Sequence, residues 1–424
     1  MIQVLTHSWA LLLGMMLLMV GNGVQGTLLG IRGGLEGFST FEMSVVMSGY
    51  FAGFLGGSRL APLMIRRVGH VRVFAALGSF ISAVLILYPS LADPWAWTGL
   101  RVIIGFCFSG VYVTAESWLN NAASNENRGK ALSLYLIVQM AGIIIAQALL
   151  NLGDPSGFVL FVIPSVLVSI AFAPILLSVS PTPAFDTTKP MSLGDLYRLS
   201  PLGCVGIIVL GGVFSAQFGM AAVFGTEIGL SVREISVFVS MIYIGGLVLQ
   251  YPIGWISDRI DRRQLILAVT GIAALASLLP ILWNQSFSIL LLAGFLIGGM
   301  TNPLYALLLA YVNDFLELED MAAASSGLVF LNGMGAIAGP VVTGWAMGAM
   351  GPMGFFAYMG LLLLGLLGYG LWRSTQRAAP AVEETGAFVT VSPSASPVAV
   401  DMAQEVYIDT QQDEIDTETT SSAQ

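Results

Sequence analysis

Twelve long apolar runs, separated by short polar or charged stretches, dominate the sequence. A bilayer core of ~30 Å needs about 20 apolar residues in an α-helix. The runs have this length, and they lack the alternating polarity of membrane β-strands. The sequence therefore predicts an all-α membrane protein with twelve transmembrane helices, at residues 9–31, 43–65, 73–92, 95–119, 131–153, 157–179, 202–226, 235–257, 264–283, 287–312, 322–348 and 352–372.

The composition argues against soluble enzymes and metalloproteins. The chain is 56% hydrophobic and 10% charged, whereas ordinary globular chains are ~45–50% apolar. The first run continues into "GNGVQGTLLG" with no cleavage site, so we expect a retained helix. Cys107 and Cys204 lie inside apolar runs, and His7 and His70 are the only histidines. We therefore expect free thiols, no metal, no cofactor, no catalytic residues and no nucleic-acid partner.

The basic residues predict the orientation in the membrane. Of sixteen Lys and Arg residues, thirteen fall at or beside one set of alternate loops, while Arg32 and Arg233 lie on the other side and Arg101 lies within a run. Positive charge is retained on the cytoplasmic face. We therefore assign both termini to the cytoplasm.

A polar interval at residues 178–201 divides the runs into six and six. We expect a first six-helix bundle at 1–179, a cytoplasmic loop at 180–201, a second bundle at 202–374 and a tail at 375–424. The tail contains nine acidic residues against Arg377 alone, and it is rich in Ser, Thr, Pro and Ala. Such a composition buries little apolar surface, so we expect a disordered, solvated tail.

The two halves share an Arg-rich loop after their second run, and "GWISDRIDRR" in the second half resembles the signature of the major facilitator superfamily. Asp261 departs from it where the family usually has Gly. The positions that fit are Gly254, Ile256, Asp258, Arg259, Arg262 and Arg263. In the first half Arg67, Gly69 and Arg72 fit, while Pro62 and Arg66 replace the usual Gly and Asp.

Further motifs support this resemblance. Arg101 and Gly105 match the Arg-x-x-x-Gly signature of the fourth helix. The segments "AESWLNNAASNENRGKALSLY" and "SSGLVFLNGMGAIAGP" are similar to the YcaD-like branch of bacterial inner-membrane transporters. The resemblance implies two pseudo-symmetric six-helix bundles and a cavity lined by the first, fourth, seventh and tenth helices. It also implies solute transport across the bacterial inner membrane, and we expect a monomer.

Two charged residues lie within the fourth run, and each has two interpretations. Arg101 either serves substrate or proton coupling or extends its side chain to the nearby membrane boundary. Glu116 either carries a coupling proton or pairs with loop arginines as part of a gate. Glu227, near the outer end of the seventh run, is a further candidate for coupling. Because the core has few charges, we expect a neutral, zwitterionic, monovalent or amphipathic solute rather than a multivalent ion.

Uncharged polar residues on the expected cavity helices complete the candidate site. They either bind the solute or hydrogen-bond between helices. These residues are Asn22, Gln25, Tyr112, Gln217, Asn302 and Tyr305. A stripe of Gln139, Gln147 and Asn151 faces either the cavity or the other half.

The sequence predicts a secondary transporter that works by alternating access, with proton coupling left open. The alternative is a nontransporting receptor or sensor that signals through the tail. We further expect the Arg-rich loops to form a cytoplasmic latch, intact in the outward-facing state, in which Asp258 accepts hydrogen bonds from nearby arginines. The first-half loop has Arg66 in place of Asp, so the two halves of the latch should be unequal.

Overall fold

The computed structural model describes residues 2–124, 127–177, 191–283, 286–317, 320–376 and 385–422, and these contain helices and no strands. The first half comprises α1 (Ile2–Leu35), α2 (Thr40–Val68), α3 (His70–Leu87), α4 (Pro94–Ala122), α5 (Arg128–Leu149) and α6 (Val159–Leu177). The second half comprises α8 (Pro201–Glu227), α9 (Val232–Ser257), α10 (Arg262–Leu282), α11 (Phe287–Asn313), α12 (Met321–Met350) and α13 (Gly354–Ser374). A short helix, α7 (Leu193–Leu199), precedes the second half, and α14 (Pro397–Ser422) follows it.

Each predicted apolar run overlaps one long helix, which confirms the all-helical membrane class. Ten helices among the described residues are long and apolar enough to cross a membrane. The apolar part of α6 is shorter, at Val159–Pro174. The α2 helix has the length but is less apolar. The full number of twelve crossings therefore stays a prediction.

Helices at corresponding positions in the two halves pack in the same pairs. The α1–α5, α2–α4 and α3–α6 contacts recur as α8–α12, α9–α11 and α10–α13. Glycines permit the close approaches: a Cβ atom on Gly53 would lie 2.8 Å from the backbone nitrogen of Phe106, and one on Gly245 would lie 3.0 Å from that of Gly299. Small residues at such contacts let membrane helices pack closely.

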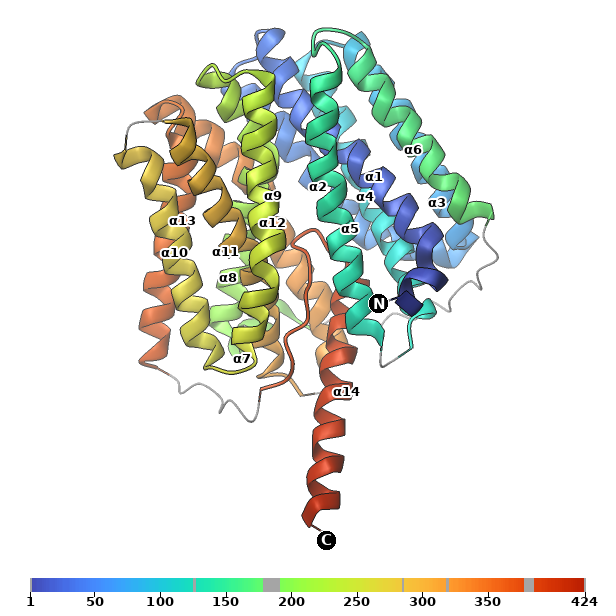
Figure 1. The fold of residues 1–424 in the computed structure, drawn as a ribbon, viewed down its shortest axis with the longest axis vertical. Coiled ribbons are helices and arrows are strands. Elements are labelled where there is room, and N and C mark those ends of the chain that lie inside the picture. Colours follow the sequence, from blue (N-terminus) through green and yellow to red (C-terminus); the bar gives the residue numbers. More distant parts are fainter. Residues whose placement is uncertain are drawn as a thin grey trace.

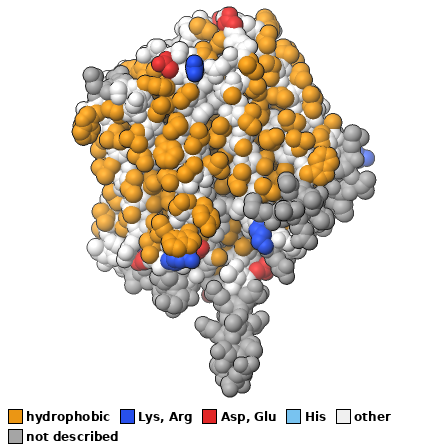
Figure 2. Space-filling model, viewed as in Figure 1, with side chains coloured by type: hydrophobic (Ala, Val, Ile, Leu, Met, Phe, Trp, Pro, Cys, Tyr) orange, Lys and Arg blue, Asp and Glu red, His pale blue; other side chains and the backbone are white. Residues whose placement is uncertain are grey.

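The surface in Figure 2 carries a broad apolar belt, with charged side chains gathered near its two edges. Large exposed side chains such as Phe80, Leu275 and Trp345 contribute to the molecule's apolar surface. Soluble proteins rarely expose so much contiguous apolar area. The belt therefore fits a protein surrounded by lipid.

The two halves meet at one end of the molecule and part at the other. At the closed end the Thr40 hydroxyl donates to Glu227 Oε1 at 2.6 Å, and nearer the centre the Ser48 hydroxyl donates to the Ile337 carbonyl at 2.6 Å. At the other end, which we call the tail end, α14 projects from the molecule (Figure 1). The chain before α14 runs up between the halves. The structure is thus open toward the tail end, and the tail occupies the opening.

The structure differs from the expected solvated tail. Every side chain from 385 to 410 is buried or half-buried, and Ser396, Met402 and Tyr407 are at most 2% exposed. Composition suggested disorder because the tail cannot form a core by itself. The two halves supply the buried surface against which the tail packs. The composition of the tail alone gives no sign of that surface.

Candidate functional site

A central cavity lies between the halves, deep in the opening. The first, fourth, seventh and tenth long helices all line it, through Met19 on α1, Tyr112 on α4, Phe214 on α8 and Asn302 on α11. This agrees with what the resemblance implied. Helices α2, α5, α9 and α12 also contribute, and tail residues 392–395 close the cavity from the tail end.

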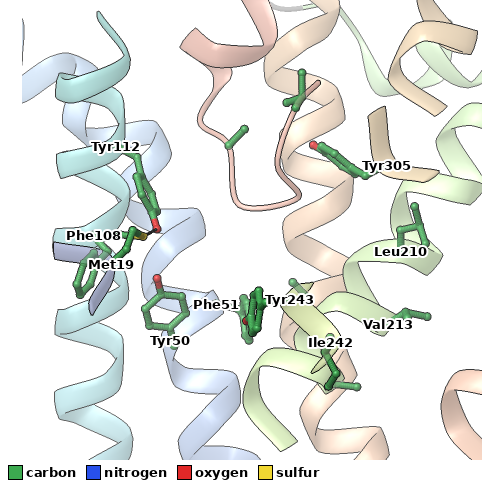
Figure 3. Packing of buried hydrophobic residues seen from close by; sticks show 14 of the residues in the cluster. Met19, Tyr50, Phe51, Phe108, Tyr112, Leu210, Val213, Ile242, Tyr243 and Tyr305 are labelled. Atoms are coloured by element: carbon green, nitrogen blue, oxygen red, sulfur yellow. Dashed lines mark hydrogen bonds between the residues drawn. The ribbon is translucent and has the colours of Figure 1, made fainter. Parts of the chain in front are cut away.

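Aromatic rings form a large part of the cavity wall. Tyr50 lies 5.4 Å from Phe218 between ring centroids, which brings α2 against α8 across the two halves. Phe54 lies 5.7 Å from Tyr112. Figure 3 shows the Tyr112 hydroxyl directed at the Met19 sulfur, a contact of 3.0 Å. Such walls favour flat or apolar parts of a ligand.

Several buried polar atoms at the cavity have no hydrogen-bond partner among the described residues. They are Asn22 Oδ1, Asn332 Oδ1 and the hydroxyl of Tyr305. The first two residues line the cavity, and Figure 3 shows Tyr305 beside the tail loop. Asn302 also lines the cavity, and its amide donates to the Gly298 carbonyl at 3.0 Å. Buried polar atoms normally have a partner, so these atoms are suited to receive one from a ligand.

Arg101 is fully buried on α4, which excludes the interpretation that it reaches the membrane boundary. Its guanidinium donates to Gln25 Oε1 at 2.9 Å and lies 4.8 Å from the Tyr50 ring centroid. Gln25 in turn donates to the Tyr88 hydroxyl at 3.2 Å. None of the ion pairs in the described part of the chain involves Arg101. Its positive charge therefore lies behind the cavity wall without a carboxylate.

Glu116 is also fully buried, about 22 Å further along α4 at ~1.5 Å per residue. It accepts hydrogen bonds from the Tyr135 hydroxyl at 3.3 Å and from the Ser396 backbone at 3.2 Å. The Ser396 hydroxyl is a third donor. The expected pairing with loop arginines is not found among the described ion pairs. Ser396 of the tail supplies hydrogen-bond donors to Glu116 instead.

The two glutamines at matching positions differ in their contacts. Gln25 holds Arg101, as described above. Gln217 donates to the Thr301 hydroxyl at 3.0 Å and thereby links α8 to α11. The interhelical interpretation therefore fits Gln217 best. The stripe on α5 differs in the same way. Gln139 lines the cavity, whereas Asn151, in the turn after α5, donates to the Gln147 carbonyl near the end of that helix.

The charged loop of the second half binds the tail. Arg262 Nη1 contacts both carboxylate oxygens of Asp314, at 2.5 and 2.6 Å, and Nη2 donates to the Gly386 carbonyl at 2.6 Å. Asp258 accepts from the Phe388 backbone at 2.8 Å, rather than from an arginine as expected. The Phe388 ring packs so close to Gly254 that a Cβ there would lie 2.5 Å from Cδ1.

The remaining latch residues have local roles. Arg259 is exposed and stacks on Trp255, 4.0 Å from the ring centroid. Arg263 is buried, 5.9 Å from the Tyr311 centroid. In the first half, Arg67 and Arg72 are exposed on either side of Gly69, whose φ of +87° suits a glycine at this helix junction.

Below the central cavity lies a wider vestibule of about 1050 Å³, open toward the tail end. Arg59, Arg66 and Arg128 line it from the first half, and Asp401 and Glu405 line it from the tail. Arg128 pairs with Glu405 at 3.1 Å and lies 3.7 Å from Asp409. The first half therefore presents basic side chains to the vestibule, and the tail presents acidic side chains that face them.

Sequence reasoning missed the aromatic wall and Asn332. Tyr50 and Phe54, and likewise Phe214 and Phe218, are spaced four residues apart, which places each pair on one helix face. That signal was available, but aromatic pairs of this kind are common in any membrane core. Which face meets the cavity depends on contacts between distant helices.

Two transporter family models match parts of this chain. The Sugar (and other) transporter model matches residues 10–190, and the Major Facilitator Superfamily model matches residues 202–400. An uncharacterized MFS-type transporter of Yersinia pestis is 26% identical over 78% of this chain and 87% of its own length. The uncharacterized MFS-type transporter YcaD of Escherichia coli is 26% identical over 80% of this chain and 88% of its own.

Solved structures share the fold. The nucleoside transporter NupG aligns with a TM-score of 0.75 at 15% identity, covering 86% of this chain and 99% of the other. The fucose:proton symporter FucP of E. coli aligns with a TM-score of 0.56 at 15% identity, covering 86% and 98%. At this identity the likeness concerns the fold alone.

Proposed function

We propose that this chain is a member of the major facilitator superfamily, a transporter rather than an enzyme, and that it moves a small solute across the bacterial cytoplasmic membrane by alternating access. Twelve crossings, a monomer and cytoplasmic termini complete the proposal. On this assignment the tail end faces the cytoplasm, in accord with the basic residues that gather there.

The central cavity carries the proposal. It lies between the two halves, is closed at one end by contacts such as that of Thr40 with Glu227, and is separated from the open vestibule at the other end only by tail residues 392–395 among the described residues. A midplane site between two halves that separate at one end at a time is what alternating access requires. The unsatisfied atoms Asn22 Oδ1 and Asn332 Oδ1 supply polar groups on both sides of it.

The cavity favours a flat, neutral or monoanionic solute. Aromatic rings from α2 and α8 suit a planar apolar body, and the amides suit a few polar edges. The uncompensated charge of Arg101 lies against the Tyr50 ring, behind the wall, and disfavours a cation there. The second-half runs contain no charged residue, so a multivalent ion would have few partners.

Glu116 is the candidate for proton coupling. It is a fully buried carboxyl whose described neighbours are hydrogen-bond donors rather than cations. A carboxyl in this position would bind a proton before it becomes secluded from water. Glu227 lies instead in the contact that closes the far end, where it would act in gating.

Two measurements test the function. A metabolite profile of cells lacking the protein, compared with cells overproducing it, identifies the solute and the direction. Flux of that solute is then measured in proteoliposomes at several pH values. We expect saturable flux that Arg101→Ala abolishes, and that Glu116→Gln uncouples from the proton gradient. Arg198→Ala, an exposed arginine on α7 outside the cavity and the latch, serves as the control.

A nontransporting receptor is the second candidate, because the tail contacts the cavity and would report its occupancy. The same vesicles distinguish the two. A receptor would bind the solute tightly and show no flux, with or without a gradient.

A further inference from the structure

The tail end of the transport path is occupied by the chain's own tail. Residues 385–396 run up between the halves, and α14 begins at Pro397 and leads back out (Figure 1). All the side chains from 385 to 410 are buried or half-buried. We call residues 385–410 the tail plug.

The plug is bonded to both halves. On the first half, Ser396 donates to Glu116 and Glu405 pairs with Arg128. On the second half, the Asn332 amide donates to the Pro393 carbonyl at 2.6 Å. Gln404 accepts from Ser325 at 2.6 Å and donates to Asn313 at 3.1 Å. These partners are polar groups that the two halves bury, so the dock is specific rather than a loose apolar groove.

The plug also fills the central cavity. Residues 392–395 line it, and only about 50 Å³ of space remains. One water occupies about 30 Å³ in the liquid, whereas ligand pockets measure about 300–1,000 Å³. Solute and plug therefore compete for the same volume.

A docked plug further prevents the halves from closing at the tail end. Alternating access requires the vestibule to narrow while the far end opens. Groups from both halves are bonded to the intervening segment, at Glu116 and at Asn332. The plug thus acts as a wedge that holds one conformation.

We propose that the tail plug autoinhibits this transporter, by excluding solute from the central cavity and by blocking closure of the vestibule. Transport then requires the plug to leave. This inference rests on the proposed function, since it names the regulation of the same site.

Cysteine labelling tests docking without knowledge of the solute. In a Cys107→Ala, Cys204→Ala background, Ser58→Cys reports on a position that lines both the cavity and the vestibule. Ser124→Cys, exposed on a loop at the tail end, is the control. Deleting residues 385–424 should raise the maleimide labelling rate at position 58 by about tenfold or more, with no change at 124. An unchanged rate at 58 would overturn the plug.

A full-length variant guards against misfolding of the truncated chain. Ser396→Glu places a like charge against Glu116 and should expel the plug, raising labelling at position 58 as the deletion does. Thr410→Glu is the matched control, because the Thr410 hydroxyl donates to the Val406 carbonyl within α14. If neither Ser396→Glu nor the deletion raises labelling, the plug is not the barrier.

Solute flux then separates the two proposals. With the solute identified from metabolite profiles, the deletion and Ser396→Glu should raise the initial flux about tenfold. Faster labelling with unchanged flux would overturn autoinhibition and leave transport intact. Faster labelling with no flux from either chain would overturn the transport function and leave the docked plug.

Discussion

The two halves share a packing scheme but bury different chemistry. The second-half runs contain no charged residue, whereas α4 of the first half carries Arg101 and Glu116 in full burial. The second half concentrates its charge near the α9–α10 loop, where Arg262 at the start of α10 forms a buried pair with Asp314 at the end of α11. The corresponding first-half loop exposes Arg67 and Arg72. The two halves therefore differ in their buried charge: the first half buries Arg101 and Glu116 as single charged groups, and the second half buries an ion pair where the tail docks.

The largest expected effect separates the two loops. Arg262→Ala leaves the Asp314 carboxylate buried without its cation, so it should destabilise the protein by about 3–5 kcal/mol. Arg67→Ala removes an exposed side chain and should stay within about 0.5 kcal/mol. Thermal unfolding in detergent measures both. A similar loss of stability in the two variants would show that the two loops contribute equally to folding.

Arg101→Ala should come next, because it removes the buried cation behind the cavity wall. Solute flux should fall by about 100-fold, as expected when a buried charge-assisted contact worth about 1.5–3 kcal/mol is lost. Arg101→Lys keeps the charge without the paired geometry toward Gln25 and Tyr50, and should retain part of the flux. Unchanged solute flux in the Arg101→Ala variant would show that this buried charge of the first half does not act in transport.

Glu116→Gln tests whether the first half also carries the proton. The amide can still accept from Tyr135 but cannot ionise, so exchange flux should persist while uphill uptake driven by a proton gradient is lost. Counterflow and gradient-driven uptake in the same vesicles measure the two separately. Full gradient-driven uptake by Glu116→Gln would exclude this carboxyl as the coupling site.

Asp258→Asn should reduce transport more than Arg66→Asn, by a few-fold, because only the second-half loop keeps the family's carboxylate. The structure adds that Asp258 also binds the plug through the Phe388 backbone. The comparison is therefore made in chains lacking residues 385–424, where only the latch role remains. Equal flux in the two variants would argue against the asymmetry of the latch.

The last expected effect is the pH dependence of the plug. Burial in the dock raises the pKa of Asp401 from its ordinary 3.8 to about 7, and the neighbouring Glu405 adds to the rise. The protonated form therefore docks better, and docking should weaken up to about tenfold as pH rises from 6 to 8. Ser325 on α12 also contacts this group, and the charged side chains that share its vestibule are Arg59, Arg66, Arg128 and Glu405.

Labelling of Ser58→Cys at pH 6 and pH 8 measures this change. The rate must be divided by that of Ser124→Cys, since maleimide reactivity itself rises with pH. Asp401→Asn should abolish the corrected pH dependence. If the corrected labelling rate of Asp401→Asn still changed with pH, another titratable group would be responsible for the pH dependence.

The helices were predictable because a membrane leaves the backbone few choices. Each long apolar run must satisfy its own N–H and C=O groups, and helices do so locally. The helix α9, for example, ends at Ser257, where the apolar run was expected to end. The family signature placed Arg101 and the Asp258–Arg263 loop for the same reason, since both are local patterns.

The site was less predictable because its contacts join distant segments. The composition of residues 375–424 predicted a solvated tail. In the structure the Ser396 backbone donates a hydrogen bond to Glu116, which lies 280 residues earlier in the chain. The Asn332 amide donates to the Pro393 carbonyl, and no local sequence pattern predicts either contact. Asn22 and Tyr112 were expected at the cavity from their depth and helix, whereas Tyr50 and Phe218 emerged only from the packing of α2 against α8.

The central claim is that a small solute crosses between the halves and that charge in the first half acts on it. The most direct measurement is initial solute flux in proteoliposomes that contain the chain without residues 385–424, compared with the same chain carrying Arg101→Ala. The account predicts saturable flux in the first and a loss of about 100-fold in the second. Tight solute binding with no flux in the first would contradict it.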